Sequence, residues 1–187
     1  MSMKSAGTPA SVALACLFSA LCAAGAFISI PLPLGPVPLA LSNLFAVLGG
    51  LLLGPLWGAL SAAAYVGLGA LGFPVFSGGR GGLAHLAGPT GGYLAGYVLG
   101  AVLAGLLARR RGWTGSILGS ALGFAAILGL GACGLKWLNG ISWSSALAAG
   151  VLPFLPLDAI KAILAALICH RLGSFVDSLR GVRDVGS

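Results

Sequence analysis

Two side chains near the start of the last apolar segment, Asp158 and Lys161, are the first candidates for chemistry. Residues three positions apart share a helical face, so a carboxylate and an ammonium group are expected side by side. Ionisable groups within a membrane span are costly, and they mark either a functional site or a stabilising ion pair. The site is favoured over a purely structural pair, because the predicted topology puts both residues on the same side as Arg80 and Asn43.

A glycine-rich segment, 72–93, contains Arg80 between two Gly-Gly pairs. Glycines let backbone N–H groups approach a ligand, because no Cβ is in the way. A planar guanidinium suits a carboxylate, which it can bind with two hydrogen bonds. Apolar walls with a few convergent polar groups are typical of a ligand pocket. We therefore predict that this segment forms a wall of a small-molecule site; the alternative is that Arg80 is simply solvated.

Asn43 offers a donor and an acceptor just after a connection with four prolines in eight residues, 31–38. Prolines remove backbone donors and cannot continue a helix, so this connection is expected to be extended. Asn43 then has two interpretations, a ligand contact or the N-cap of the following helix.

Several absences from the sequence argue against an enzyme. No lysine follows a glycine, so there is no P-loop for ATP hydrolysis. Ser77 lacks the Gly-x-Ser-Gly context of an intramembrane serine protease, because Val75 stands where the first glycine belongs. His85 and His170 have no metal partners at ligand spacing, and both are interpreted as interfacial. We predict recognition rather than catalysis, with no cofactor and no metal.

The composition predicts a membrane protein. Of the 187 residues, 58% are hydrophobic and 7% are charged, and the mean hydropathy is +1.06. Soluble domains contain about 25% charged residues. The net charge of +7 does not indicate nucleic acid, because most cations flank apolar runs, and the four cysteines lie inside such runs without metal spacing. One membrane domain over 1–187 is expected.

Six apolar segments are long enough, or nearly so, to be membrane helices. The first could be a signal peptide, but a retained span is favoured because five more apolar segments follow. Trp137 and Trp143 are expected at the membrane interface, next to a short surface helix over 144–152. The predicted spans are approximately 10–30, 43–54, 56–72, 90–108, 114–135 and 156–171.

The distribution of cations orients this all-α bundle. Six spans put both termini on one side, which then has seven cations, whereas the other side has Arg80 and Lys136. Loops rich in Lys and Arg stay in the cytoplasm. Residues 1–9 and the tail 172–187 are therefore predicted to be cytoplasmic, and the glycine-rich segment faces outside.

Several motifs along nearly the whole chain resemble the BioY family, the biotin-binding S components of energy-coupling-factor (ECF) vitamin transporters. The motifs that carry the resemblance are Val37-Pro-Leu-Ala-Leu-Ser-Asn-Leu44, Leu51-Leu-Leu-Gly-Pro55, Gly58-Ala-Leu-Ser61, Gly69-Ala-Leu-Gly-Phe-Pro-Val-Phe76, Gly78-Gly-Arg-Gly-Gly82, Gly88-Pro-Thr-Gly-Gly-Tyr93 and Pro153-Phe-Leu-Pro-Leu-Asp-Ala-Ile-Lys161. The two glycine-rich motifs are specific, whereas the helical stretches alone are not.

This resemblance implies a six-helix bundle in a prokaryotic cell membrane that binds biotin from outside. It implies a membrane-embedded coupling (T) subunit and two ATPase subunits as partners. The small-residue face of the first span, including Ala20 and Ala24, would pack on the coupling subunit, and the loop between the first two spans would be a lid. The ligand contacts it implies are Arg80, Asp158, Lys161, Asn43, Gly79 and Tyr93. One departure is Ser42, where the family often has glutamine.

The chemistry of biotin fits these residues. Its ureido N–H groups need an acceptor such as Asp158 or Asn43, and its carboxylate needs Arg80 or Lys161. Three other functions are weighed: a solitary biotin transporter, an intramembrane enzyme and a purely structural bundle subunit. The enzyme lacks a nucleophile–base pair, and the structural subunit does not explain why the charged residues converge on one side.

Overall fold

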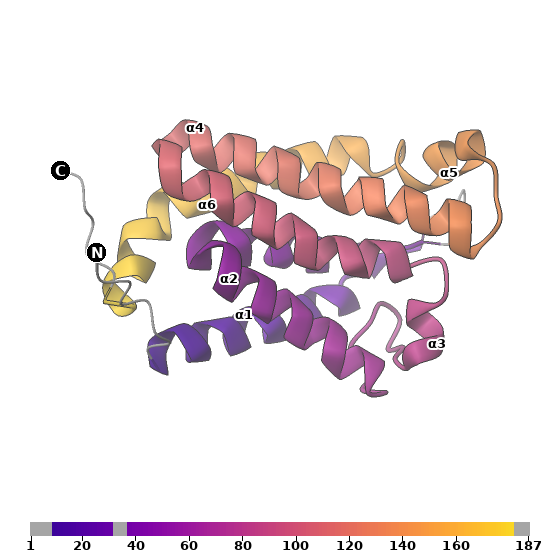
Figure 1. Cartoon of the computed structure of the whole chain (residues 1–187), viewed down its shortest axis with the longest axis horizontal. Helices are drawn as coiled ribbons and strands as arrows, with labels where there is room; N and C mark the ends of the chain where they lie inside the picture. Colours follow the sequence, from indigo (N-terminus) through magenta and orange to yellow (C-terminus); the bar gives the residue numbers. More distant parts are fainter. Residues whose placement is uncertain (1–8, 32–36, 182–187) are drawn as a thin grey trace.

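The computed structural model describes residues 9–31 and 37–181, and within these it leaves the side chains of 109–111 undescribed. Long helices dominate it (Figure 1), as the sequence predicts. The elements are α1 (Pro9–Phe27), β1 (Ser29–Ile30), β2 (Leu39–Ala40), α2 (Ser42–Ala70), α3 (Leu83–Leu86), α4 (Gly91–Leu138), α5 (Trp143–Gly150) and α6 (Leu155–Leu179).

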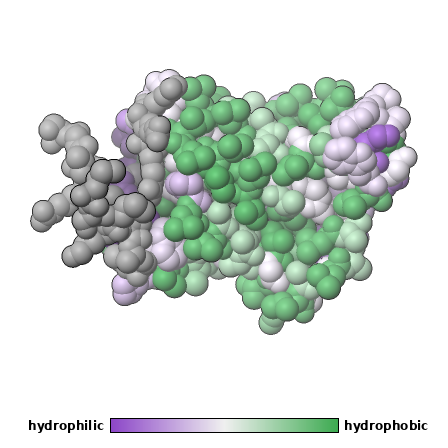
Figure 2. All heavy atoms as spheres, viewed as in Figure 1, coloured by the Kyte–Doolittle hydropathy of each residue, from purple (hydrophilic) through white to green (hydrophobic). Residues whose placement is uncertain are grey.

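The long helices have the length and hydropathy of membrane spans. Among the described residues, five helical stretches meet both conditions: Pro9–Phe27, Ser42–Ala70, Gly91–Ala108, Gly112–Leu138 and Leu155–Leu179. Hydrophobic residues cover the middle of the molecule, and paler or hydrophilic residues gather toward its two ends (Figure 2). The predicted spans 43–54 and 56–72 fall together in the single stretch Ser42–Ala70, so this count differs from the predicted six.

The helix α2 is sharply folded at Gly54, where the backbone leaves helical geometry with φ 80° and ψ 176°. A Cβ placed on Gly58 would lie 2.5 Å from Cα of Gly50. Residues eight apart in a straight helix are separated by about 12 Å along its axis. The two halves of α2 therefore pack against each other, in agreement with the turn predicted at Gly54-Pro55.

The contact at Gly58 leads to a stability prediction. Gly58→Ala is expected to lower the melting temperature in detergent, because the added methyl group collides with the backbone of the other half of α2. Gly67→Ala is the matched control in the same helix, since nothing lies within 4 Å of a Cβ there. It should keep or raise the melting temperature, because alanine favours helix by about 1 kcal/mol over glycine. Equal melting temperatures for the two variants would contradict this packing.

The helix α4 likewise contains two antiparallel stretches, which reverse near Gly112 at φ 54°. A Cβ on Gly92 would lie 2.9 Å from Cα of Gly134, and one on Gly100 would lie 2.7 Å from the carbonyl oxygen of Gly123. Such close approach needs small residues at the interface, as is common between membrane helices. The predicted spans 90–108 and 114–135 correspond to these two stretches.

Helix α6 is longer than predicted. It continues to Leu179, whereas the predicted span ends at 171 and is followed by a predicted tail over 172–187. The extension is packed: Val176 belongs to the core, and the Arg180 Nε donates to Ser11 Oγ at 3.1 Å. The end of α6 therefore lies against the start of α1, while α3 and α5 lie at the opposite end of the molecule (Figure 1). Residues 182–187 of the predicted tail lie outside the described residues.

The connection between α1 and α2 begins and ends in a short antiparallel pair, β1 and β2. Ser29 pairs with Ala40, and Ile30 pairs with Leu39. These strands flank the segment 31–38, which was predicted to be extended. Residues 31, 37 and 38 belong to no helix or strand, and 32–36 lie outside the described residues, so the prediction stays a prediction. This pairing brings Val37 and Pro38 to the end of the bundle that contains α3 and α5.

Candidate binding site

A pocket opens at this end of the bundle. Like typical ligand pockets, it combines apolar walls with a few polar groups. Helices α2, α3, α4 and α6 and the connections between them contribute to it. Its larger apolar and aromatic walls are Tyr65, Phe76, Tyr93, Tyr97, Ile127 and Phe154.

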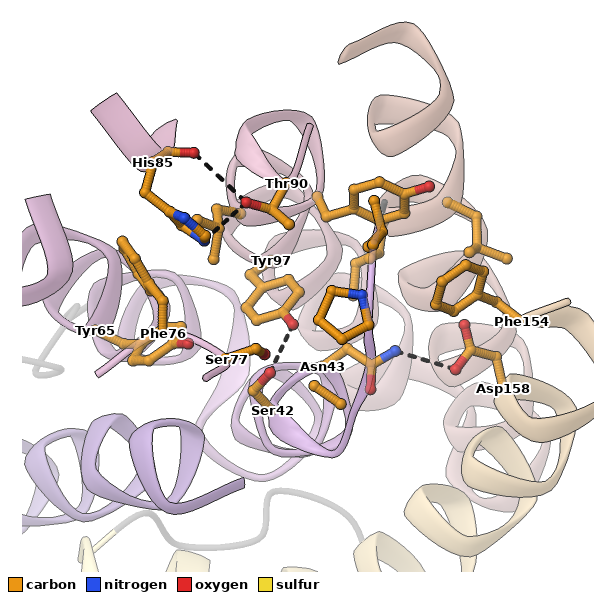
Figure 3. Close-up of a pocket in the computed structure, with 17 residues that line it drawn as sticks. Ser42, Asn43, Tyr65, Phe76, Ser77, His85, Thr90, Tyr97, Phe154 and Asp158 are labelled. Carbon is orange, nitrogen blue, oxygen red and sulfur yellow. Dashed lines mark hydrogen bonds between the residues drawn. The ribbon is translucent and has the colours of Figure 1, made fainter. Parts of the chain in front are cut away.

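A buried cluster of Asn43, Asp158 and Lys161 joins α2 to α6 at one wall of the pocket. Asn43 Nδ2 donates to Asp158 Oδ1 at 3.0 Å (Figure 3). Lys161 Nζ donates to Asn43 Oδ1 at 3.0 Å and to Asp158 Oδ1 at 3.3 Å. All three side chains are at most 7% exposed. The predicted pairing of Asp158 with Lys161 is present, and Asn43 completes it.

The cluster leaves one strong acceptor unused. Lys161 Nζ also donates to the Ala40 carbonyl at 2.8 Å, so its three N–H groups all have partners. Asp158 Oδ2, by contrast, is buried and has no hydrogen-bond partner among the described residues. Buried polar atoms are nearly always hydrogen-bonded, so an orphan acceptor needs an explanation. Because Asp158 lines the pocket, a ligand N–H donor there would supply the missing bond.

Two hydroxyl groups of the pocket wall are bonded to each other. Ser42 Oγ and Tyr97 OH lie 2.7 Å apart, and both residues line the pocket (Figure 3). Tyr93 uses its hydroxyl differently, since it donates to the Gly150 carbonyl at 2.6 Å and so ties α4 to α5. Its ring remains in the pocket wall, 6.0 Å from the ring of Phe154.

The glycine-rich segment contributes Phe76 and Ser77 to the pocket rather than Arg80. Gly78 and Gly79 have φ values of 77° and 68°, which glycine adopts without strain. This tight turn pairs Phe76 with Arg80, and the Phe76 N–H donates to the Arg80 carbonyl at 2.9 Å. Phe76 is buried, whereas Gly79 and Arg80 are exposed and do not line the pocket. A ligand role for these two residues stays a prediction.

His85 on α3 lines the pocket, where the sequence analysis interprets it as interfacial. Its ring stacks on Phe76 with centroids 5.1 Å apart, and its Nε2 shares a 2.9 Å hydrogen bond with Thr90 Oγ1. Burial, and then the positive charge of Arg80, lower the pKa of His85 below its ordinary value of 6.5. The imidazole is therefore neutral at pH 7 and belongs to the wall of the pocket.

A lowered pKa of His85 has a consequence for stability. The unfolded chain binds a proton on this histidine at a higher pH than the folded chain does, so acidification below about pH 6.5 costs folding free energy. His85→Gln keeps a polar group near Thr90 but does not titrate. We expect the melting temperature of this variant to fall less than that of the wild type between pH 7.5 and 5.5. An equal fall in both proteins would contradict the assignment.

Some of the predicted ligand residues line the pocket and others do not. Asn43, Asp158 and Tyr93 line it, and Lys161 is joined to it through hydrogen bonds. The N-cap interpretation of Asn43 is wrong, because the N-cap position is Leu41 and the Asn43 side chain bonds to α6. Four further pocket residues were not predicted from the sequence: Ser42, Tyr65, Tyr97 and Phe154. Tyr97 could have been found from its four-residue spacing to Tyr93, because this spacing puts both side chains on one face of α4.

The predicted partner face on α1 lies away from the pocket walls. Ala20 and Ala24 are both exposed, while Phe18 and Cys22 point into the core. All four cysteines are free thiols, as the sequence suggests. A role of Ala20 and Ala24 in binding another subunit stays a prediction.

Comparison with known proteins identifies the family. The family model described as BioY matches residues 2–178, which is most of the chain. The chain belongs to the BioY family. Curated BioY relatives match over most of their own lengths as well. The probable biotin transporter BioY of Pyrococcus horikoshii is 42% identical over 162 residues, which cover 86% of this chain and 94% of that protein.

A second relative and a solved structure agree with this BioY assignment. The biotin transporter BioY of Thermotoga maritima is 44% identical over 158 residues, which cover 83% of this chain and 91% of that protein. The crystal structure of the S-component for biotin from an ECF-type ABC transporter superposes with a TM-score of 0.82. It is 30% identical, and the match covers 90% of this chain and 95% of that chain. The predicted family is confirmed.

Proposed function

We propose that this chain is the biotin-binding, membrane-embedded subunit of an ECF-type uptake transporter. The names of its BioY relatives and of its structural neighbour support this function, and these are transporters rather than enzymes. Within the molecule, the observation that carries it is Asp158 Oδ2, a buried acceptor in the pocket without a partner among the described residues. A ureido N–H of biotin is the donor that this oxygen needs.

The rest of the pocket suits the rest of biotin. Aromatic and aliphatic side chains offer apolar surface to the thioether ring and the alkyl chain. Lys161 is already saturated with hydrogen bonds, so it holds Asp158 in place and does not meet the ligand carboxylate. That carboxylate would lie toward Arg80, which is exposed next to the pocket residues Phe76 and Ser77. Gly79 would allow its backbone to approach the same group.

We further propose six crossings of the prokaryotic cell membrane, with both termini in the cytoplasm. The sharp fold of α2 at Gly54 supports two crossings within that element. The bond of Arg180 to Ser11 supports both ends of the described chain lying on one side, opposite the pocket. The excess of Lys and Arg at that end supports its cytoplasmic location. The pocket then faces outside, where biotin is captured, and Val37 and Pro38 of the connection before α2 form part of its wall. Residues 32–36 of the predicted lid lie outside the described residues.

Transport against a gradient needs energy that this chain has no motif to supply. A membrane-embedded coupling subunit and two ATPase subunits would provide it, with Ala20 and Ala24 in the contact with the coupling subunit. Uptake of labelled biotin in cells lacking all coupling subunits tests this proposal. Uptake should be lost without them and restored with them. Full uptake in their absence would support the alternative of a solitary transporter.

The ligand itself is tested by purification. Protein prepared in detergent from cells supplied with biotin should release biotin on denaturation, in an amount approaching one molecule per chain, as measured by mass spectrometry. A different bound molecule, or no biotin even after addition of excess biotin, would contradict the proposed function.

A further inference from the structure

The hydrogen-bonded hydroxyl pair of Ser42 and Tyr97 is a second polar feature of the pocket, separate from the cluster of Asn43, Asp158 and Lys161. Ser42 is 1% exposed and Tyr97 is 7% exposed, and both line the cavity. Each hydroxyl contributes one proton, and the 2.7 Å bond between them uses one of the two. The hydroxyl of Tyr65 also bonds to Ser42, which adds a third proton and a second bond. One O–H of this hydroxyl group therefore remains free to donate to an acceptor in the pocket.

The position of this pair is fixed relative to the acceptor Asp158. Ser42 and Asn43 are consecutive residues at the start of α2, and consecutive side chains on a helix point about 100° apart. Ser42 reaches Tyr97 on α4, whereas Asn43 reaches Asp158 on α6 (Figure 3). The pocket thus has a hydrogen-bond donor on one side and a hydrogen-bond acceptor on the other, both held by the first turn of α2.

A cyclic urea matches this arrangement, because it carries N–H donors and one carbonyl acceptor on a single small ring. We infer that the Ser42–Tyr97 hydroxyl pair donates to the ureido carbonyl oxygen of the ligand while Asp158 accepts from its N–H. This rests on the proposed function and assigns the residues that select the ureido group. A ligand carboxylate does not suit this position, because the carboxylate of Asp158 would repel it. Lys161 does not offset this repulsion, since its ammonium group is already bonded to Asp158 and to the Ala40 carbonyl.

Recognition of the ureido oxygen is tested with a ligand that differs from biotin only at that atom. In 2-thiobiotin, sulfur replaces the ureido oxygen, so the N–H groups and the carboxylate stay while the strong acceptor is lost. The wild type should bind biotin about fivefold or more tightly than 2-thiobiotin, as expected for one net hydrogen bond. Binding is measured by equilibrium titration of both ligands into detergent-purified protein.

The double variant Ser42→Ala/Tyr97→Phe is the critical protein. Each single variant leaves the other hydroxyl with its proton, so each should retain part of the preference for biotin. The double variant should bind the two ligands within about twofold of each other, because neither hydroxyl of the pair remains. Removing both partners of the Ser42–Tyr97 bond leaves neither end of that bond unsatisfied, so the variant is expected to fold with only the Tyr65 hydroxyl losing a partner.

Ser120→Ala is the control, because it removes a buried hydroxyl that is already donated to the Ile117 carbonyl and does not line the pocket. The preference for biotin over 2-thiobiotin should stay at the wild-type ratio in this variant, whatever its affinity. An unchanged ratio in the double variant would overturn the inference while leaving the proposed function intact. A wild type that binds neither ligand would overturn both.

Discussion

Lys161→Met is expected to lower the melting temperature more than any other variant considered, and to reduce biotin affinity at least about tenfold. Lys161 is 3% exposed and makes three hydrogen bonds, one of them to the carboxylate of Asp158. Removing one partner of a buried ion pair costs roughly 3–5 kcal/mol, because an uncompensated charge stays behind. The affinity for biotin falls as well. Without the ammonium group beside it, the buried carboxylate of Asp158 takes up a proton, and one of its oxygens then donates a hydrogen bond instead of accepting one from the ligand.

A second substitution separates stability from binding in this prediction. In Asp158→Asn/Lys161→Met both charges are gone, and the remaining amide groups at 43 and 158 can bond to each other. Replacing both members of a buried pair is often close to neutral. The double variant should therefore recover most of the lost melting temperature while its affinity for biotin stays low. A single variant as stable as the wild type would contradict a structural role for Lys161, and recovered binding in the double variant would contradict the role of Asp158.

Asp158→Asn alone is expected to weaken biotin binding by about ten- to 150-fold. This range corresponds to the loss of one hydrogen bond to a charged group, roughly 1.5–3 kcal/mol. The substitution keeps the size of the side chain, and it exchanges a carboxylate for an amide whose NH₂ group repels a ligand N–H donor. Equilibrium titration with biotin at a temperature where the variant is folded measures the change.

The control for this variant is Asp177→Asn, the same substitution at a carboxylate near the far end of α6. Asp177 does not line the pocket, so biotin affinity should stay at the wild-type value. If the two variants lose affinity equally, the effect comes from the membrane bundle as a whole and not from the pocket. If Asp158→Asn binds as tightly as the wild type, the proposed N–H acceptor is wrong.

The sequence predicts the helices and the Asp158–Lys161 pair because both depend on local information. Apolar length defines a span, and a spacing of three residues defines a shared helical face. The bond from Asn43 to Asp158 joins residues 115 apart in the chain. That contact depends on how α2 packs against α6, which no local pattern specifies. Asn43 could therefore be nominated from its chemistry but not assigned its partner.

The glycine-rich segment was predicted less well, because its charged residue, Arg80, does not line the pocket. Positive φ values at Gly78 and Gly79 make a turn that buries Phe76 and exposes Arg80. Glycine permits such a turn without requiring it, so the direction of the arginine could not be deduced. Tyr97 was missed for a related reason, since a tyrosine in an apolar helix is indistinguishable from core until its hydroxyl partner Ser42 is known.

An experimental structure of the detergent-purified protein with biotin bound would locate the ligand and its ureido group. We expect biotin in the pocket between α2, α4 and α6, with a ureido nitrogen within about 3 Å of Asp158 Oδ2, a normal hydrogen-bond distance. Biotin bound elsewhere, or bound in this pocket with its ureido group away from Asp158, would contradict the central claim.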